Sequence, residues 1–97
     1  MQIYITGDGL EVTEALHDYV LKKFERLGSL LHETTRLAIR LKVEKLDQIA
    51  EADIYMAGHD LHAKAMSRTL YTAIDLLHDK IKQQTIKLKQ KLEDKKR

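Results

Sequence analysis

Basic residues near the C-terminal end follow a helical spacing that suits contacts with phosphate groups. Lys80, Lys87 and Lys91 recur at intervals of seven and four residues, which places them on one side of an α-helix. Acidic residues such as Asp75 fall on the other flank, whereas an ordinary solvated helix mixes the two signs as i,i+4 pairs. The pattern indicates an anion-binding surface, with nucleic acid as the expected partner. Lys82 and Lys89 fall at the second edge of the apolar stripe, so the predicted members on this helix are Lys80, Lys82, Lys87, Lys89 and Lys91.

A second group of basic residues lies in an earlier helical stretch. Lys22 and Arg26 follow one flank of its apolar stripe, and Lys23 falls inside the stripe. A lysine facing a core either extends its stem to the stripe's edge or is placed to meet an anion beside the helices. The sequence leaves both interpretations open. If two such helices share one face of a sheet, their basic flanks can form a continuous positive surface.

Other residue patterns give no support for catalysis. Gly7-Asp8-Gly9 is too short for a phosphate-binding loop, and it ends a strand as a plain turn would. His59 and His62 are three residues apart across a turn and a strand start, so they should point to opposite faces rather than to one metal ion. We therefore predict a protein that is not an enzyme, with no metal, no cofactor and no small-molecule substrate.

Length and composition bound the remaining choices. The chain has 97 residues, of which 43% are hydrophobic and 33% charged, as expected for a single domain, 1–97. It contains no cysteine, which excludes disulfides and cysteine metal sites. No apolar run has the length of a membrane span, so we expect a soluble cytoplasmic protein that contacts no membrane. The net charge is only +2, but residues 80–97 carry eight of the 17 Lys and Arg residues and two of the 15 acidic ones.

The periodicity of the apolar residues predicts the elements that position these lysines. Alternating segments indicate strands over 2–6, 36–44, 48–57 and 61–66. A helix of about 16–19 residues should begin after Thr13 and continue to Leu31. A second helix, capped by Ser67 or Thr69, should carry the apolar stripe from Ile74 to Leu92, and a frayed basic tail should follow over 93–97. The predicted fold is an α/β two-layer sandwich in β-α-β-β-β-α order, with a four-stranded mixed sheet and both helices on one face.

Several segments resemble the ribosome hibernation promoting factor family, in particular its short form. The likeness runs from MQIYITGDGLEVTEALHDYV at the start through LKVEK and GHDLHAKA to LYTAIDLLHDKIKQQ (70–84). The last segment, with Tyr71, Ile74 and Asp75 and the lysines downstream, is the most specific. The resemblance implies a sandwich like that of double-stranded-RNA-binding domains.

The resemblance also implies a function and a set of contacts. Members of this family bind the small ribosomal subunit between head and body in stationary phase, where they block the mRNA and tRNA sites and inhibit translation. The short form acts with a separate ribosome modulation factor to form inactive ribosome dimers, and we expect this chain to be a monomer when free. Family basic positions coincide with Lys23, Arg26, Lys80, Lys87, Lys89 and Lys91, whereas Lys22 and Lys82 come from the helical wheel alone. Two departures are Gln83, where relatives commonly carry Arg, and Thr85 in the apolar stripe.

Two other functions stay open at the level of sequence. The chain could be a protein-interaction module of the sigma-factor modulation type, in which Tyr4, Tyr55 and Met66 on the open sheet face form the contact patch. It could also be a general binder of double-stranded RNA, which reads shape and charge rather than sequence.

Overall fold

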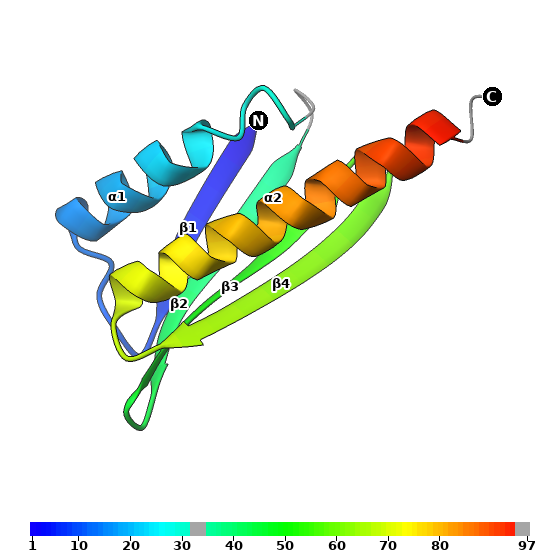
Figure 1. Cartoon of the computed structure of the whole chain (residues 1–97). Coiled ribbons are helices and arrows are strands. Elements are labelled where there is room, and N and C mark those ends of the chain that lie inside the picture. Colours follow the sequence, from blue (N-terminus) through cyan, green and yellow to red (C-terminus); the bar gives the residue numbers. More distant parts are fainter. Residues whose placement is uncertain (32–34, 95–97) are drawn as a thin grey trace.

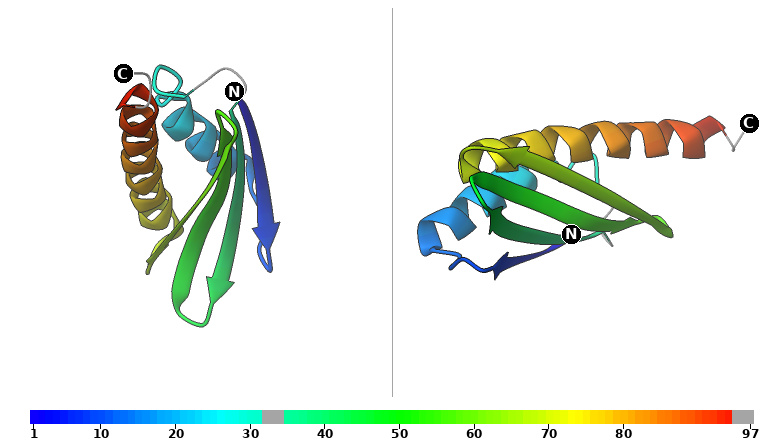
Figure 2. Two further views of the ribbon diagram at one scale, coloured as in Figure 1. Left: turned by 90° about the vertical axis from the view of Figure 1, so that its right-hand side faces the viewer. Right: turned by 90° about the horizontal axis from the view of Figure 1, so that it is seen from below.

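Two layers, a sheet and a pair of helices, make up residues 1–31 and 35–94, the part of the chain that the structure describes (Figure 1). The computed structural model contains β1 (Gln2–Asp8), α1 (Glu14–Glu25), β2 (Arg36–Glu44), β3 (Asp47–Met56), β4 (His59–Ser67) and α2 (Leu70–Asp94). Both helices cover the same face of the sheet (Figure 2). The predicted α/β sandwich in β-α-β-β-β-α order is confirmed.

The strands lie in the order β1-β2-β3-β4. β1 pairs with β2 in parallel through the crossover formed by α1, and β2, β3 and β4 form an antiparallel meander. The β3–β4 connection consists of Ala57 and Gly58, which both have positive φ values (52° and 79°), as two-residue hairpin turns often require. β4 therefore begins at His59, slightly earlier than the sequence indicated.

The hydrophobic core lies between the helices and the inner face of the sheet. Alternate residues of β2 and β3 point into it, as their period-two pattern predicted. The helices contribute side chains at intervals of three and four residues. The largest fully buried side chains of the core include Val20, Phe24, Leu27, Leu37, Ile39, Leu41, Ile54, Ile74, Leu77 and Ile81.

α1 is shorter than its apolar spacing predicted, because the regular helix ends at Glu25. It begins as expected, with the Thr13 hydroxyl accepting a hydrogen bond of 3.2 Å from the backbone N–H of Leu16. After Glu25 the chain continues in tight turns, in which the N–H of Gly28 donates to the carbonyl of Glu25 at 3.0 Å. Glycine is a weak helix former, which explains the early end. Leu27 and Leu31 are nevertheless buried, as their spacing indicated, but from turns rather than from the helix.

α2 begins at the predicted Thr69 cap, whose hydroxyl accepts a 3.3 Å hydrogen bond from the N–H of Thr72. It continues to Asp94, so Glu93 of the expected tail is helical, while residues 95–97 lie outside the described part. The Thr85 hydroxyl is buried in the apolar stripe without a hydrogen-bond partner. Neither α1 nor α2 is long and apolar enough to cross a membrane, as far as the described residues go.

Candidate nucleic-acid interface

The basic group of the first helix surrounds its C-terminal end, where positive charge complements the helix dipole. Lys22 and Lys23 occupy the last turn and Arg26 follows directly after it. With Tyr19 these side chains line a hollow of about 230 Å³. Lys22 and Arg26 are exposed, whereas Lys23 is half-buried. The hollow can therefore present at least two solvent-facing cations to an anion.

Lys23 is tied to the second helix. Its Nζ lies 3.3 Å from Oδ1 of Asp75, and the same carboxylate oxygen accepts a hydrogen bond of 2.5 Å from the Tyr19 hydroxyl. The Tyr19 hydrogen bond, supported by Lys23, lowers the pKa of Asp75. The Tyr19 ring also packs edge-on against Tyr71, with 4.7 Å between ring centroids. We call Tyr19, Lys23, Tyr71 and Asp75 the helix clasp, because it joins α1 to α2 at the point where the sequence left the role of Lys23 open.

One flank of α2 leans over the edge strand β4. The ammonium group of Lys80 donates a 2.6 Å hydrogen bond to the carbonyl of Lys64, and the Gln84 amide donates one of 3.0 Å to the carbonyl of His62. Farther along the same flank, Lys87 and Lys91 are exposed. Lys80, Lys87 and Lys91 form the β4-side row, in agreement with the predicted spacing.

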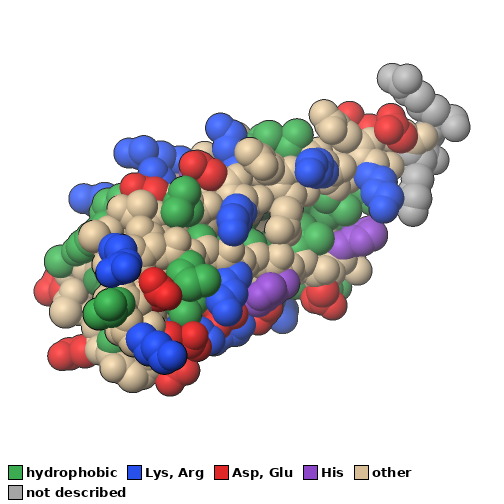
Figure 3. Space-filling view, turned by 60° about the horizontal axis from the view of Figure 1, so that its bottom comes forward, with side chains coloured by type: hydrophobic (Ala, Val, Ile, Leu, Met, Phe, Trp, Pro, Cys, Tyr) green, Lys and Arg blue, Asp and Glu red, His purple; other side chains and the backbone are tan. Residues whose placement is uncertain are grey.

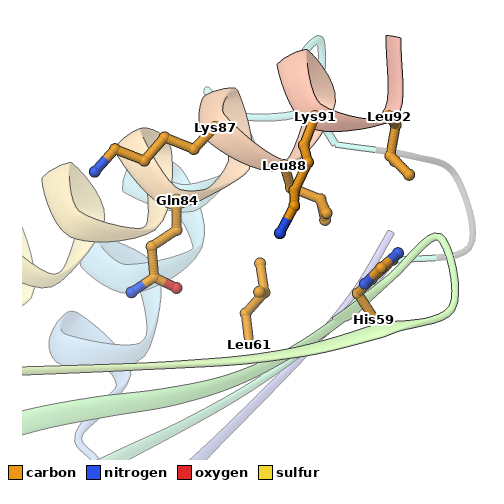
Figure 4. A pocket seen from close by; sticks show the side chains of 7 residues that line it. All are labelled: His59, Leu61, Gln84, Lys87, Leu88, Lys91 and Leu92. Carbon is orange, nitrogen blue, oxygen red and sulfur yellow. The ribbon is translucent and has the colours of Figure 1, made fainter. Parts of the chain in front are cut away.

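The end of this flank borders a groove (Figure 4). Hydrophobic side chains are visible between α2 and β4, with basic and histidine side chains beside them (Figure 3). The groove has a volume of about 350 Å³. Its lining consists of His59 and Leu61 from β4 and Gln84, Lys87, Leu88, Lys91 and Leu92 from α2.

The other two lysines of α2 lie on its opposite flank. Lys82 and Lys89 follow Asp75 by seven and fourteen residues, which returns the side chain to the same side of a helix after each interval. Since Asp75 contacts α1, these lysines lie on the flank of α2 that faces α1. We call Lys22, Lys23, Arg26, Lys82 and Lys89 the inter-helix group.

The eight predicted residues are thus divided by the crest of α2. The exposed residues on the crest include Asp79, Gln83 and Gln90, none of which is basic. The expected continuous band is therefore two lines of cations, one on each side of a helix roughly 10 Å wide. α2 with these two lines is a ridge that can contact anions on both of its flanks.

The open face of the sheet also carries basic side chains, but these are paired with carboxylates. Arg40 Nη1 lies 2.8 Å from Oδ2 of Asp53, and Lys42 Nζ lies 2.7 Å from Oε1 of Glu51. His62 Nδ1 is 2.8 Å from the other Asp53 oxygen. These five residues form the open-face cluster, and Glu51 is only 8% exposed.

Titration properties follow from these pairs. Hydrogen bonds from Lys42 and from Arg40 lower the pKa values of Glu51 and Asp53, respectively. The same contacts raise the pKa values of the two basic side chains. The charges of the open-face cluster are therefore largely satisfied within the protein, and little remains to attract an external anion.

The apolar residues of the open face do not form one patch. Tyr4, Tyr55 and Met66 are each about half exposed. In the register of the sheet, Tyr55 pairs with Asp60 at one end of β4, while Met66 pairs with Ile49 near the other end. The open-face cluster lies between them. The sequence suggested that these three side chains form a single contact surface. In the structure the charged side chains of the open-face cluster separate them.

The histidines point apart, as predicted. His62 contacts the open-face cluster and His59 lines the groove on the opposite side of the sheet. Over residues 1–31 and 35–94, no set of three or more His, Asp or Glu side chains is arranged to hold a metal ion.

Sequence reasoning missed the helix clasp and the groove. The spacing predicts only that Asp75 lies on the acidic flank of the second helix, but its carboxylate accepts a hydrogen bond from Tyr19 and pairs with Lys23. The available signal was its position at the edge of the apolar stripe, opposite a tyrosine and a lysine spaced one helical turn apart. The groove had no sequence signal, because it depends on how far α2 continues beside β4.

A family model and individual related proteins both place the chain in the same family. The family model described as "Sigma 54 modulation protein / S30EA ribosomal protein" matches residues 3–93. The chain is 42% identical over 92 residues to a ribosome hibernation promoting factor of Klebsiella oxytoca, with 95% of this chain and 97% of that protein covered. It is 39% identical over 92 residues to the ribosome hibernation promoting factor of Escherichia coli (strain K12), with the same coverage.

Solved structures with the same fold include two from other bacteria. The N-terminal domain of Thermus thermophilus Protein Y superposes with a TM-score of 0.84 at 29% identity, covering 91% of this chain and 99% of that one. A ribosomal subunit interface protein from Coxiella burnetii gives a TM-score of 0.82 at 29% identity, covering 92% and 98%.

Proposed function

Because the chain belongs to the Sigma 54 modulation protein / S30EA ribosomal protein family, we propose that it is a ribosome hibernation factor that inhibits translation. It acts by binding, not by catalysis. Its target is the RNA of the small ribosomal subunit, where it occupies the space that mRNA and tRNA need. Such a target would locate the protein in the cytoplasm.

The observation that carries this proposal is the distribution of unpaired cations on both flanks of α2. Lysines that contact phosphates displace condensed counterions, which makes binding strong at low salt. A ridge with cations on two sides is suited to a cleft that has RNA on both walls, because both flanks can then contact phosphates. A single RNA duplex would contact only one flank. The inter-helix group and the β4-side row would each contact one wall.

A second part of the proposal concerns ribosome pairing. The related proteins of Klebsiella oxytoca and Escherichia coli are named for promoting hibernation. We propose that this chain likewise favours inactive ribosome dimers, together with a separate modulation factor. Mixing purified protein with ribosomes in the presence and absence of that factor, followed by gradient sedimentation, measures the dimer fraction. A dimer fraction unchanged by this protein would contradict this part alone.

Sedimentation with purified subunits tests the main proposal. The wild-type protein should migrate with small subunits and not with large ones, with an affinity that falls steeply as salt is raised. The triple variant Lys80→Gln, Lys87→Gln, Lys91→Gln should bind about a hundredfold more weakly and reduce the slope of log K against log salt by about three.

A matched control keeps the same change in net charge. Arg36→Gln, Lys45→Gln and Arg68→Gln remove three exposed cations that lie outside the predicted site. We expect this control to bind within about twofold of the wild type, because none of these residues lies beside the lysines of α2. Equal losses in both variants would show a net-charge effect only. No migration of the wild type with small subunits at any salt concentration would exclude the proposed function.

A further inference from the structure

The groove at the end of α2 combines an apolar floor with a basic rim. Its floor is formed by Leu61, Leu88 and Leu92, and Lys87 and Lys91 stand at its rim on α2. The ammonium end of Lys91 points into the gap between helix and strand (Figure 4). Neither rim lysine has an ion-pair partner among the described residues. At about 350 Å³ the groove is within the size range of ligand-binding clefts.

A strand edge runs alongside this groove. β4 is the last strand of the sheet, and the carbonyls of His62 and Lys64 point outward, where they accept hydrogen bonds from Gln84 and Lys80. In an antiparallel strand, the N–H and C=O of every second residue face the same side. Those of Asp60 therefore also face outward, beyond His62, whose carbonyl accepts the hydrogen bond from Gln84. This end of β4 offers main-chain groups for a short additional strand.

Together these features identify the chemistry of a ligand. Main-chain groups at a sheet edge pair with another extended peptide, and a pocket beside the edge accepts its alternate side chains. The leucine floor suits an aliphatic or aromatic side chain, and the two lysines suit carboxylates next to it. A nucleobase fits less well, because proteins that hold unpaired bases stack them on aromatic rings, whereas this floor is aliphatic and His59 is the one ring among the residues that line the groove.

We propose that the groove binds an extended acidic peptide segment of a protein partner. The segment adds a short strand along β4 by pairing with the outward main-chain groups of Asp60 and the N–H of His62. It inserts an apolar side chain between Leu61 and Leu92 and pairs its carboxylates with Lys87 and Lys91. This site is separate from the open sheet face. Since it shares two lysines with the β4-side row, an occupied groove would also compete with RNA on that flank.

Titration of the free, ¹⁵N-labelled protein tests the proposal without any ribosome, so its outcome does not depend on the proposed function. The probe is a fluorescein-labelled heptapeptide with a central leucine, glutamate two residues before and two residues after it, and serine at the other positions, so that in an extended strand the leucine and both glutamates face the same side. The competing probe is a uridine heptanucleotide. We expect the largest amide shifts at Asp60–His62 and at 87–92. Leu92→Glu should weaken peptide binding at least about tenfold and Lys91→Met about threefold.

Lys82→Met is the matched control, because it removes a lysine from the opposite flank of α2 and should leave peptide affinity unchanged. The spectra of all variants also report whether the fold is kept, and Lys91→Met keeps the aliphatic stem of the side chain. Three results would overturn the proposal: no peptide binding up to about 1 mM, shifts confined to other surfaces, or preferential binding of the heptanucleotide in the groove.

Discussion

The two faces of this small protein carry similar basic residues with different consequences. On the open sheet face, Arg40 and Lys42 lie within 2.8 Å of carboxylate oxygens. On the helix face, Lys87 and Lys91 have no such partner among the described residues. The number of cations is therefore a poor guide to an anion-binding surface. What distinguishes the two faces is whether the charge is already satisfied within the fold.

The difference follows from element geometry. Neighbouring strands bring side chains of opposite sign directly across from each other, as Arg40 stands across from Glu51. A helix instead separates its flanks, so that the lysines of α2 and the acidic Asp79 point in different directions. The sheet thus favours pairing, and the helix leaves its basic flanks available for a partner.

The largest expected effect is the loss of affinity for small subunits when cations of the helix face, rather than those of the open face, are neutralised. Lys22→Gln, Lys82→Gln and Lys89→Gln remove charge from the inter-helix group and should weaken binding to small subunits by about a hundredfold. Arg40→Gln with Lys42→Gln removes charge that is already paired, and affinity should change by less than about threefold. Sedimentation at a fixed salt concentration measures both, and circular dichroism confirms that each variant is folded. Equal losses would contradict the distinction between the faces.

Acid should weaken the open-face cluster. The pKa values of Glu51 and Asp53 are lowered in the folded protein, so these carboxylates stabilise the fold above their ordinary pKa values, and this stabilisation is lost as pH falls through the lowered values. We expect the free energy of unfolding, measured by urea denaturation, to fall as the pH is reduced from about 5 towards 2.

Two variants assign that loss to the cluster. Glu51→Gln should lower the free energy of unfolding by about 1 kcal/mol at pH 7 and make its fall in acid shallower. Glu44→Gln is the control, because the Glu44 carboxylate is 63% exposed and lies 3.9 Å from Lys42. If the free energy of unfolding of Glu51→Gln falls with pH in the same way as that of the wild type, other carboxylates account for the loss of stability in acid.

The smallest expected effect concerns the helix clasp, where a lysine of the helix face is paired with a carboxylate, as the basic residues of the open face are. Asp75→Asn should release Lys23 from its partner, while the Tyr19 hydroxyl can still donate to the new side chain. We expect affinity for small subunits to rise about twofold and the free energy of unfolding to fall by about 0.5 kcal/mol. Tyr19→Phe serves as a comparison, since it removes the hydrogen bond and leaves the Lys23 pair. A decrease in affinity for Asp75→Asn would show that the clasp positions the inter-helix group.

Most of the fold was predictable because the strands alternate and the helices are amphipathic. The ends of elements were less so: Leu31 keeps the helical spacing of α1, yet it is buried from a turn after Gly28. The lysine row at 80, 87 and 91 was predictable from spacing alone. The position of Lys82 and Lys89 on the opposite edge of the stripe also follows from spacing. Which of the two flanks faces β4 and which faces α1 does not, because a helical wheel contains no information about neighbouring elements.

Contacts between distant elements account for the other differences. The sequence placed Arg40 and Glu51 on the same sheet face, but only the β2–β3 register brings them opposite each other. Thr85 was noted as a polar residue in an apolar stripe, and it is buried with its hydroxyl unsatisfied. The side chain of Thr85 has a volume that fits the core, but its hydroxyl group is polar. Local periodicity alone does not predict whether such a residue is buried or exposed.

The connections between strands also predict the order in which the protein assembles. β2, β3 and β4 are joined by the short turns Lys45–Leu46 and Ala57–Gly58, so their pairing closes small loops. β1 pairs with β2 only after α1 and the following segment have crossed the sheet, which costs more loop-closure entropy. We expect β1 and α1 to form last and to open first, so that hydrogen exchange is faster in β1 than in β3. The inter-helix cations of α1 would then belong to the least protected part of the chain, while those of α2 remain anchored to the meander.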